Sequence, residues 1–381
     1  MADPLALYVH WPFCVSKCPY CDFNSHVRDR VDQEHWRQAL IADLAYEADL
    51  LPGRKISSIF FGGGTPSLMP PETVAAVIAE ADRRWGLSSD CEITLEANPN
   101  SVEVANFAVL AQAGVNRISI GVQSFDPQIL HFLGRAHSGE EARAAIAAAQ
   151  QYFARVSFDL IYARPDQNLE TWERELGDAL AFGTGHLSLY QLMIEPGTRF
   201  ATMMAKGELT LPDGDSAADL FDATQAMTAS AGLPRYEVSN HARIGEESRH
   251  NLTYWRYHDY AGIGPGAHGR RLGQATERHK KPENFLSAID RNGHGLKLEQ
   301  DLPGQERATE AMLMGLRLTE GLDLAHVEAR SGLPRAAFLD VDAAARLAGQ
   351  GLVQQDGDWL KVTDAGILLL DSLLAELVRT E

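Results

Sequence analysis

The sequence predicts an α/β fold whose main body is a parallel sheet with helical crossovers, followed by a small C-terminal helical domain of the winged-helix kind. Two observations carry this prediction. In the first half of the chain, short apolar strand-like runs alternate with helical patterns. Near the end, several helical patterns precede a short hairpin signal. Strands that alternate with helices in this way are joined by right-handed crossovers in one parallel sheet.

The first half contains candidates for six strands and five helices. The strand candidates are Leu5–His10, Ile56–Phe61, Glu92–Glu96, Arg117–Val122, Arg155–Ile161 and His186–Leu192. The helical patterns between them are Gln33–Leu50, Pro71–Trp85, Val102–Ala113, Gly139–Tyr152 and Leu169–Phe182. Pro71 suits a first helical turn, Ser101 suits an N-cap, and Gly114 suits the left-handed residue that ends a helix. Periodicity alone leaves open whether the sheet is doubly wound or curls into a barrel.

The last part of the chain is predicted to form a separate small domain. The helical patterns there are Glu306–Leu318, Leu324–Ser331, Asp340–Gln350 and a closing helix over Asp364–Arg379. A hairpin is predicted between Val353 and Val362, with Asp356 and Gly357 at its tip. Winged-helix domains often bind DNA, but the many acidic residues of this one argue against that role.

Three of the four cysteines lie close together, and their spacing indicates an iron–sulfur site. Cys14, Cys18 and Cys21 form a CxxxCxxC motif, whose first gap is one residue wider than in the paired CxxC knuckles of zinc ribbons. A short loop of this kind can supply thiolates to three irons of a 4Fe–4S cluster and leave the fourth iron open to a small molecule. The alternative is a zinc site completed by His10 or His26.

Composition excludes several classes of function. The chain has 381 residues and a formal net charge of −18, so nucleic acid backbones and anionic lipids would repel it. Only Cys91 lies outside the cysteine loop, which excludes a disulfide framework. The most apolar late segment contains Asp371 and Glu376 and is not expected to span a bilayer. No basic and apolar leader follows Met1, so we expect no signal peptide and a cytoplasmic protein.

The segment from Tyr8 to Phe23 resembles the radical S-adenosylmethionine (SAM) superfamily. The resemblance rests on the run Tyr-Val-His-Trp-Pro-Phe-Cys at its start and Cys-Pro-Tyr-Cys-Asp-Phe at its end. It implies a partial (β/α)6 barrel that is open on one side, which decides between the two sheet forms left open above. It also implies a 4Fe–4S cluster whose open iron holds the amino and carboxylate groups of SAM.

Polar and glycine residues follow the predicted strands at their C-terminal ends, where parallel α/β folds place their sites. The second strand is followed by a glycine triplet, Gly62 to Gly64, which lets the backbone approach a ligand and resembles the radical SAM glycine motif. The third strand ends in Glu96, the fourth in Gln123, and the fifth contains Asp159. We expect these groups to meet on one rim of the barrel.

Some of these residues resemble those of the oxygen-independent coproporphyrinogen III oxidases and their relatives. The matching segments are Gln123-Ser124-Phe125, Leu133-Gly134-Arg135-Ala136-His137 and Asp159-Leu160-Ile161-Tyr162. The resemblance implies SAM contacts from Tyr8, the Tyr20 backbone, Gly63, Gly64, Thr65, Glu96, Gln123, Arg135 and Asp159. Met193 aligns with a position that touches a second SAM in that family, and packing in the core is the alternative for it.

The chain departs from the oxidase pattern in two ways. Oxidative decarboxylation of coproporphyrinogen is therefore the alternative function that we expect, and not the preferred one. The oxidases carry a further cysteine two positions after the third cluster ligand, where this chain has Phe23. They also carry a substantial arm ahead of the cluster, and because Cys14 comes so early we expect no such arm here.

A second motif points to a different function. The residues His250-Asn251-Leu252-Thr253-Tyr254-Trp255 resemble the HNxxYW motif of the HemW family, relatives of the oxidases that bind and deliver heme. The resemblance implies heme contacts from His250, Asn251, Tyr254 and Trp255. A neutral imidazole can ligate iron, and aromatic faces can stack on a porphyrin. The alternative is a packed strand and turn that closes the barrel, with His250 bonded to backbone.

A basic stretch follows this motif. Between His268 and Lys281 the cations are Arg270, Arg271, Arg278, Lys280 and Lys281, against the single acid Glu277. The stretch could receive heme propionates, and a solvated loop is the alternative.

These resemblances together imply three regions. A radical SAM core would cover residues 1–235, the HNxxYW segment and the basic connection 236–300, and a C-terminal domain like that of the oxidases 301–381. The expected function is that of a heme chaperone with a SAM-ligated 4Fe–4S cluster, which passes heme to an apoprotein such as a membrane cytochrome. An electron donor is the further partner that we expect. A zinc-stabilised scaffold without redox function is the third class.

Overall fold

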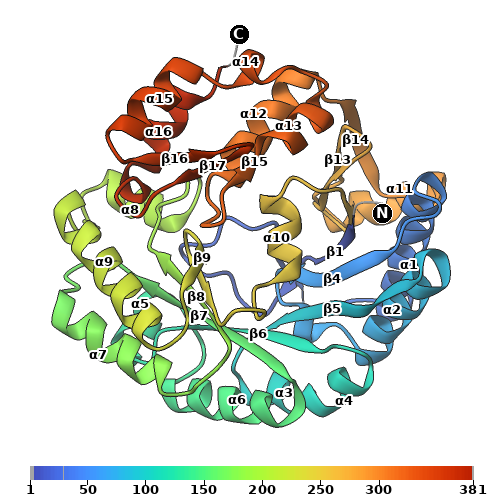
Figure 1. Ribbon diagram of the computed structural model, residues 1–381. Helices are drawn as coiled ribbons and strands as arrows, with labels where there is room; N and C mark the ends of the chain where they lie inside the picture. The colour runs from blue at the N-terminus through green and yellow to red at the C-terminus, as the bar shows by residue number, and fades with distance from the viewer. Residues whose placement is uncertain (1–3, 29, 380–381) are drawn as a thin grey trace.

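Figure 1 shows the computed structural model of the protein, which describes residues 4–28 and 30–379. Residues 1–3 lie outside the described residues. They are part of the segment from which we predict the absence of a signal peptide. The outermost residues of the first and third predicted regions also lie outside the described residues.

Six parallel strands form the centre of one large sheet, in the order of the chain. They are β1 (Leu5–Trp11), β4 (Ile56–Gly63), β5 (Leu87–Ala97), β6 (Arg117–Gln123), β7 (Arg155–Tyr162) and β8 (His186–Gln191). Each is a run of mostly buried residues, as expected for strands covered on both faces. The predicted strands and their parallel order are therefore confirmed.

The whole sheet has 12 strands, and the strands at its two edges, most of them antiparallel, were not predicted. The antiparallel strands β10 (Asn240–Ala242) and β9 (Arg235–Glu237) extend it beyond β8. Beyond β1 come β11 (Tyr260–Ile263), parallel to β1, and then the antiparallel strands β12 (His268–Arg271), β13 (Gln274–Arg278) and β14 (Leu296–Asp301). Most of these strands have three to five residues, too few to give a periodic signal in the sequence.

The sheet is curved but not closed. Among the described residues, no hydrogen-bonded pairing joins β9 to β14, the two ends of the strand order. This is the open, partial barrel that the resemblance implies. β9 contains residues on both sides of the boundary that we predict between 235 and 236, and that boundary stays a prediction.

The helices of the first half lie on the outer face of the curved sheet (Figure 1). They are α1 (Gln33–Leu50), α2 (Pro71–Trp85), α3 (Ser101–Val104), α4 (Phe107–Gln112), α6 (Gly139–Tyr152) and α7 (Leu169–Leu180). Pro71 begins α2 as predicted, and Gly114 follows α4 with a φ of 111°. The N-cap predicted at Ser101 is wrong, because the side chain of Asn100 accepts the capping hydrogen bond from Glu103 N. The single helix predicted over 102–113 is split at Ala105 and Asn106.

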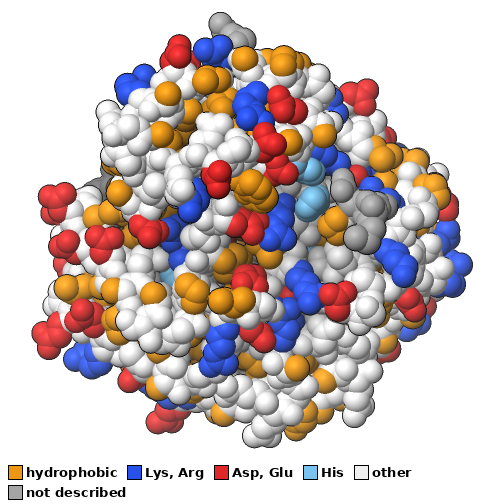
Figure 2. Space-filling view, in the orientation of Figure 1, with side chains coloured by type: hydrophobic (Ala, Val, Ile, Leu, Met, Phe, Trp, Pro, Cys, Tyr) orange, Lys and Arg blue, Asp and Glu red, His pale blue; other side chains and the backbone are white. Residues whose placement is uncertain are grey.

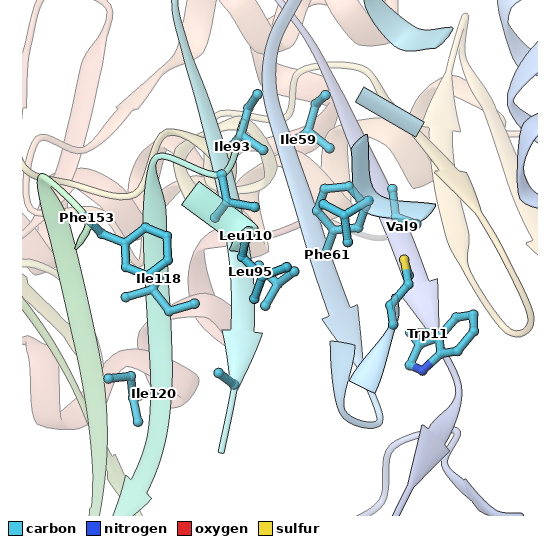
Figure 3. Close-up of a cluster of buried hydrophobic side chains, with 14 of the residues drawn as sticks. Val9, Trp11, Ile59, Phe61, Ile93, Leu95, Leu110, Ile118, Ile120 and Phe153 are labelled. Atoms are coloured by element: carbon cyan, nitrogen blue, oxygen red, sulfur yellow. The ribbon is translucent and has the colours of Figure 1, made fainter. Parts of the chain in front are cut away.

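The main core lies between this sheet and its helices. Figure 3 shows side chains of neighbouring strands packed side by side, with Leu110 of α4 among them. The strand residues labelled there are Val9, Trp11, Ile59, Phe61, Ile93, Leu95, Ile118 and Ile120. Because these chains point outward to the helices, the inner face of the barrel is left for polar groups and ligands.

Several further elements were not predicted from the sequence. They are α5 (Pro127–Phe132), α8 (Arg199–Ala205), α9 (Gly214–Ser230), α11 (Pro282–Asn292), the short strands β2 (Phe13–Cys14) and β3 (His26–Val27), and the 3-10 turn η1 (Pro66–Leu68). β2 and β3 pair with each other and so hold the two ends of the cysteine loop together.

The HNxxYW residues lie on a short helix, α10 (Arg249–Trp255), inside the curve of the sheet (Figure 1). The side chain of Ser248 caps this helix by accepting a hydrogen bond from Asn251 N. The alternative of a strand and turn is therefore wrong.

The C-terminal domain lies between the two edges of the sheet (Figure 1). Its elements are α12 (Gly304–Gly315), β15 (Leu322–Asp323), α13 (Leu324–Ser331), α14 (Arg335–Phe338), α15 (Val341–Gly349), β16 (Val353–Asp356), β17 (Trp359–Val362), η2 (Ile367–Leu369) and α16 (Leu370–Leu377). The predicted hairpin is β16–β17, and β15 adds a third strand. A second core that includes Phe338, Leu360 and Leu377 holds this domain together. None of the helices over residues 4–28 and 30–379 is long and apolar enough to cross a bilayer.

Candidate cofactor and ligand sites

The three clustered cysteines open into one cavity of about 450 Å³, here called the cysteine cavity. Cys14, Cys18 and Cys21 are all half-buried. The thiol of Cys14 accepts a hydrogen bond from Thr65 Oγ1 at 3.5 Å, and that of Cys18 accepts one from Arg135 Nη1 at 3.5 Å. Burial raises the pKa of Cys14, and the hydrogen bond from Thr65 opposes that rise by favouring the thiolate, the form in which cysteine binds iron.

The two histidines of the zinc alternative do not complete a site with these thiols. The ring of His10 bonds to Tyr8 OH and to the Asn24 carbonyl, both at 2.9 Å, and His26 Nε2 bonds to Asn24 Oδ1 at 3.2 Å. In the part of the chain that the structure describes, no three His, Cys, Asp or Glu side chains are arranged to hold a single metal ion.

The residues predicted to contact SAM meet at the carboxyl ends of the strands, around the same cavity. Those that line the cysteine cavity are Tyr20, Gly63, Gly64, Thr65, Glu96, Gln123, Arg135 and Asp159. Tyr8 is the exception, since it lines the neighbouring cavity. Met193 also lines the cysteine cavity and is 69% exposed, so the core-packing alternative for it is wrong.

Two buried carboxyl groups give this cavity its electrostatic character. Glu96 Oε2 accepts a hydrogen bond from Gly63 N at 3.2 Å, and burial raises the pKa of Glu96 to about 7. Asp159 accepts from Gln123 N at 3.3 Å and from Gln123 Nε2 at 2.9 Å, and burial raises its pKa to about 6. These bonds hold Gln123 at a φ of 66°, a left-handed conformation that non-glycine residues rarely adopt.

Arg135 supplies the positive charge of the cavity. Its Nη2 donates to Asn98 Oδ1 at 2.5 Å and to the Gly121 carbonyl at 2.8 Å. Asn98 in turn donates to Thr65 Oγ1 at 3.3 Å, which makes it a link that sequence reasoning missed. Asn98 follows Glu96 by two residues in the sequence, and this position could have identified it as a site residue.

The cavity therefore fits the polar end of SAM. That molecule carries an ammonium, a carboxylate, a sulfonium and two ribose hydroxyls, and the cavity offers two carboxyl groups, a guanidinium and an amide beside three thiols. Gly64 is needed for the approach of backbone, since a Cβ there would lie 2.7 Å from the Phe13 carbonyl oxygen.

A second cavity, of about 1120 Å³, lies beside the first and is here called the aromatic cavity. Tyr254 and Trp255 line it, together with residues of β12, α12 and α13. The residues that line both cavities are Lys17, Asp22, Phe23, Ser25, Gly63 and Glu96. A ligand in one cavity would therefore share a wall with a ligand in the other.

The aromatic cavity is cationic although the chain as a whole is acidic. Its Lys and Arg residues are Lys17, Arg54, Arg270, Arg271, Lys280, Arg307 and Arg330. Its Asp and Glu residues are Asp22, Glu96, Asp259 and Glu310. In Figure 2, Lys and Arg side chains lie around the middle of this face of the molecule together with Asp and Glu side chains. An excess of positive charge in a chain with a net charge of −18 favours an anionic ligand.

Two of the predicted heme residues, His250 and Asn251, do not line either cavity. His250 is 1% exposed and lies behind Tyr254: its Nδ1 bonds to Ser58 Oγ at 3.0 Å and its Nε2 to the Tyr254 hydroxyl. Its ring stacks on Phe60 at 5.0 Å between centroids. Burial lowers the pKa of His250 to about 3, so its imidazole is neutral.

The basic stretch is a hairpin, β12–β13, and the solvated-loop alternative is wrong for its arginines. Arg278 is fully buried and pairs with Glu47 at 2.6 Å and with Asp43 at 3.2 Å. Arg271 pairs with Glu47 at 2.6 Å, and Arg270 pairs with Glu310 at 2.8 Å. These three cations already have carboxylate partners, so they fix the hairpin to α1 and α12.

The comparisons with known proteins agree with this geometry. Residues 8–179 match the Radical SAM superfamily, and residues 302–369 match the HemN C-terminal domain. Over 386 residues the chain is 39% identical to "Radical S-adenosyl methionine domain-containing protein 1, mitochondrial" of Bos taurus, covering 98% of this chain and 87% of that protein. Over 381 residues it is 39% identical to "Heme chaperone HemW" of Escherichia coli (strain K12), covering 97% of each.

The fold has a solved counterpart. Coproporphyrinogen III oxidase (HemN) from Escherichia coli superposes with a TM-score of 0.81 at 24% identity, over 98% of this chain and 90% of that one. The likeness confirms the predicted fold, and the sequence matches confirm the predicted family. The chain therefore belongs to the radical SAM superfamily, whose members share a 4Fe–4S cluster and SAM, and within it to the HemW family.

Proposed function

We propose that this protein is a heme chaperone, which binds heme in the aromatic cavity and passes it to an apoprotein such as a membrane cytochrome. The observation that carries the proposal is the cavity itself: about 1120 Å³, with Tyr254 and Trp255 in its wall and more cations than acids in its lining. A porphyrin needs aromatic faces to stack on, and its propionates need cations. The name of the Escherichia coli relative, "Heme chaperone HemW", supports the same function.

Cys14, Cys18 and Cys21 are the proposed ligands of the cluster. The proposed SAM contacts are Tyr8, the Tyr20 backbone, Gly63, Gly64, Thr65, Glu96, Gln123, Arg135 and Asp159. SAM bound beside a reduced cluster would supply one-electron radical chemistry. In this arrangement Arg135 is the partner for the SAM carboxylate, and Glu96 and Asp159 are the partners for its cationic and hydroxyl groups. Met193 is the proposed contact to a second SAM.

His250 is the proposed iron ligand. Ser58 holds Nδ1, which orients the ring and leaves Nε2 as the nitrogen for iron. That nitrogen would become available when the Tyr254 side chain, which covers it, turns away. His268 is the second candidate, since it is exposed and already lines the aromatic cavity. Asn251 is proposed to act through α10, because its backbone N–H closes the cap of that helix.

Radical chemistry on a tetrapyrrole is the second candidate function. The common wall of the two cavities favours it, because a SAM-derived radical would form next to a large bound ligand. Phe23 lies in that wall and is 57% exposed, at the position where the oxidases carry a further cysteine.

A heme titration of the anaerobically reconstituted protein tests the chaperone proposal. We expect saturable binding, and a higher Kd for Trp255→Ala than for the native chain. Trp359→Ala is the matched control, because Trp359 is 47% exposed on β17 and lines neither cavity. Transfer of the bound heme to a heme-depleted cytochrome is then measured by recovery of the acceptor's spectrum. Absence of saturable binding would contradict the proposal.

A further inference from the structure

Arg307 of α12 differs from the other arginines of the aromatic cavity. Within the described residues it forms no ion pair, and its guanidinium makes one hydrogen bond, from Nη2 to the Ser331 carbonyl at 3.1 Å. Its Nε is buried without a hydrogen-bond partner. A guanidinium with five N–H donors is thus left with most of them unused.

The other arginines that line this cavity all have a carboxylate. Arg54 and Arg330 both pair with Asp259, at 2.9 and 2.5 Å. Arg270 pairs with Glu310, and Arg271 with Glu47. Paired arginines have little free energy to gain from a further anion, whereas a half-buried unpaired one has much to gain. Among the arginines of this wall, Arg307 is therefore the one whose unused N–H donors a ligand carboxylate would accept.

The guanidinium of Arg307 is also held in place before any ligand arrives. The Ser331 carbonyl fixes Nη2, and the tip of the β12–β13 hairpin lies against Nη1: a Cβ on Gly273 would stand 2.7 Å from it. Gly273 has a φ of 77°, so the turn itself requires glycine. Preorganisation of this kind lowers the entropy cost of binding an anion.

Apolar side chains lie beside this cation on the same cavity wall. Leu272, at the hairpin tip, is 62% exposed, and Met314, about two turns after Arg307 on α12, is 36% exposed. A ligand that suits this corner has a carboxylate joined to a broad apolar body.

We propose that Arg307 is the anchor for a carboxylate of the ligand in the aromatic cavity, which is a propionate if the ligand is heme. The proposal rests on the proposed function for the identity of the ligand. The guanidinium would hold both carboxylate oxygens through two parallel N–H···O bonds. Arg307 does not line the cysteine cavity, so its substitution should affect ligand binding in the aromatic cavity alone.

The experiment compares heme with heme dimethyl ester, in which both propionates are masked. Each ligand is titrated into the native chain, Arg307→Gln, Arg307→Lys and the control Arg291→Gln. Arg291 is exposed on α11 and, like Arg307, bonds to a backbone carbonyl, but it lies outside the cavity. Absorption spectra are recorded with each titration.

The native chain should bind heme about tenfold to a hundredfold more tightly than the ester, the range of one charged hydrogen-bonded contact. Arg307→Gln should lose this preference, with ester affinity and band positions unchanged, and Arg307→Lys should keep part of it. Arg291→Gln should behave as the native chain. Equal native affinity for both ligands, or an equal loss of both in Arg307→Gln, would overturn the anchor and leave the chaperone proposal standing. If the native chain binds neither ligand, both proposals are wrong.

Discussion

Glu96 Oε2 accepts a hydrogen bond from Gly63 N at 3.2 Å, and both residues line the cysteine cavity and the aromatic cavity. This pair is part of the wall between the proposed SAM site and the proposed heme site. A change in the charge of Glu96 therefore changes the electrostatic potential in both cavities.

The first prediction concerns the pH dependence of SAM binding. Burial raises the pKa of Glu96 to about 7 and that of Asp159 to about 6, so both gain protons as the pH falls through this range. The cationic groups of SAM bind the carboxylate forms, and affinity should therefore rise from about pH 5.5 to about pH 8 and then level off. Glu96→Gln should weaken binding at the upper end and flatten the dependence near pH 7. Equilibrium dialysis with labelled SAM measures this, and an unchanged pH profile in Glu96→Gln would contradict the assignment.

The second prediction concerns the cluster. Because Cys14, Cys18 and Cys21 open into one cavity, alanine at any of them should abolish both iron and acid-labile sulfide in anaerobically purified protein. Cys91→Ala is the control: Cys91 is buried in the main core and should leave both contents unchanged. Stoichiometric zinc without sulfide would show that the loop holds a different metal.

The third prediction separates the chaperone from the oxidase. With reconstituted cluster, SAM and an electron donor, the protein should not convert coproporphyrinogen III to protoporphyrinogen, because Phe23 stands where the oxidases have a cysteine. Product is measured by fluorescence after oxidation to the porphyrin. Turnover clearly above that of Cys18→Ala would favour the second candidate function.

The fourth prediction concerns the buried ion pairs that attach the β12–β13 hairpin to α1. Glu47 is 0% exposed and bonds to both Arg271 and Arg278, so Glu47→Ala leaves two buried cations with fewer partners. We expect a loss of about 3–5 kcal/mol in the free energy of unfolding, measured in urea. Glu34→Ala, on the same helix but in an exposed pair with Arg37, should change stability little. Equal effects of the two substitutions would contradict this account.

The sequence predicts the elements of the first half well because they are long and periodic. α1, α2 and α6 have the predicted bounds. α2 and α6 each have an apolar face over about four turns, whereas the buried face of α1 also carries Asp43 and Glu47. α10 was missed because seven residues are too few to show a helical period, and its aromatic residues favour strands. Length alone does not decide which elements can be recognised, since α9 has 17 residues and was not predicted.

The sites were predictable only where a motif lies in one segment. The cysteine loop and the strand ends could be recognised in this way, but the lining of the aromatic cavity could not. Arg307, Asp259 and Tyr8 come together there from distant parts of the chain. Nor does sequence show that Arg271 and Arg278 are neutralised by α1, because such pairing depends on tertiary contacts.

The last prediction concerns the iron ligand. His250 Nε2 bonds to the Tyr254 hydroxyl, four residues along α10, and this bond competes with any bond from that nitrogen to iron. Tyr254→Phe removes the competitor but keeps the aromatic face, so heme should bind more tightly with its bands in the same place. His250→Ala should shift the Soret and visible bands, because the axial ligand sets the electronic state of the iron.

Two further variants complete this test, with absorption spectra recorded through each titration. Trp255→Ala should weaken the binding free energy by about 1–3 kcal/mol, the scale of one buried aromatic side chain, with little spectral change. His268→Ala should change neither the bands nor the affinity, although His268 lines the cavity. The reverse pattern, with native bands in His250→Ala and shifted bands in His268→Ala, would assign the iron to His268. His250 would then be a residue that positions Tyr254 in the cavity wall, through the bond that links their side chains.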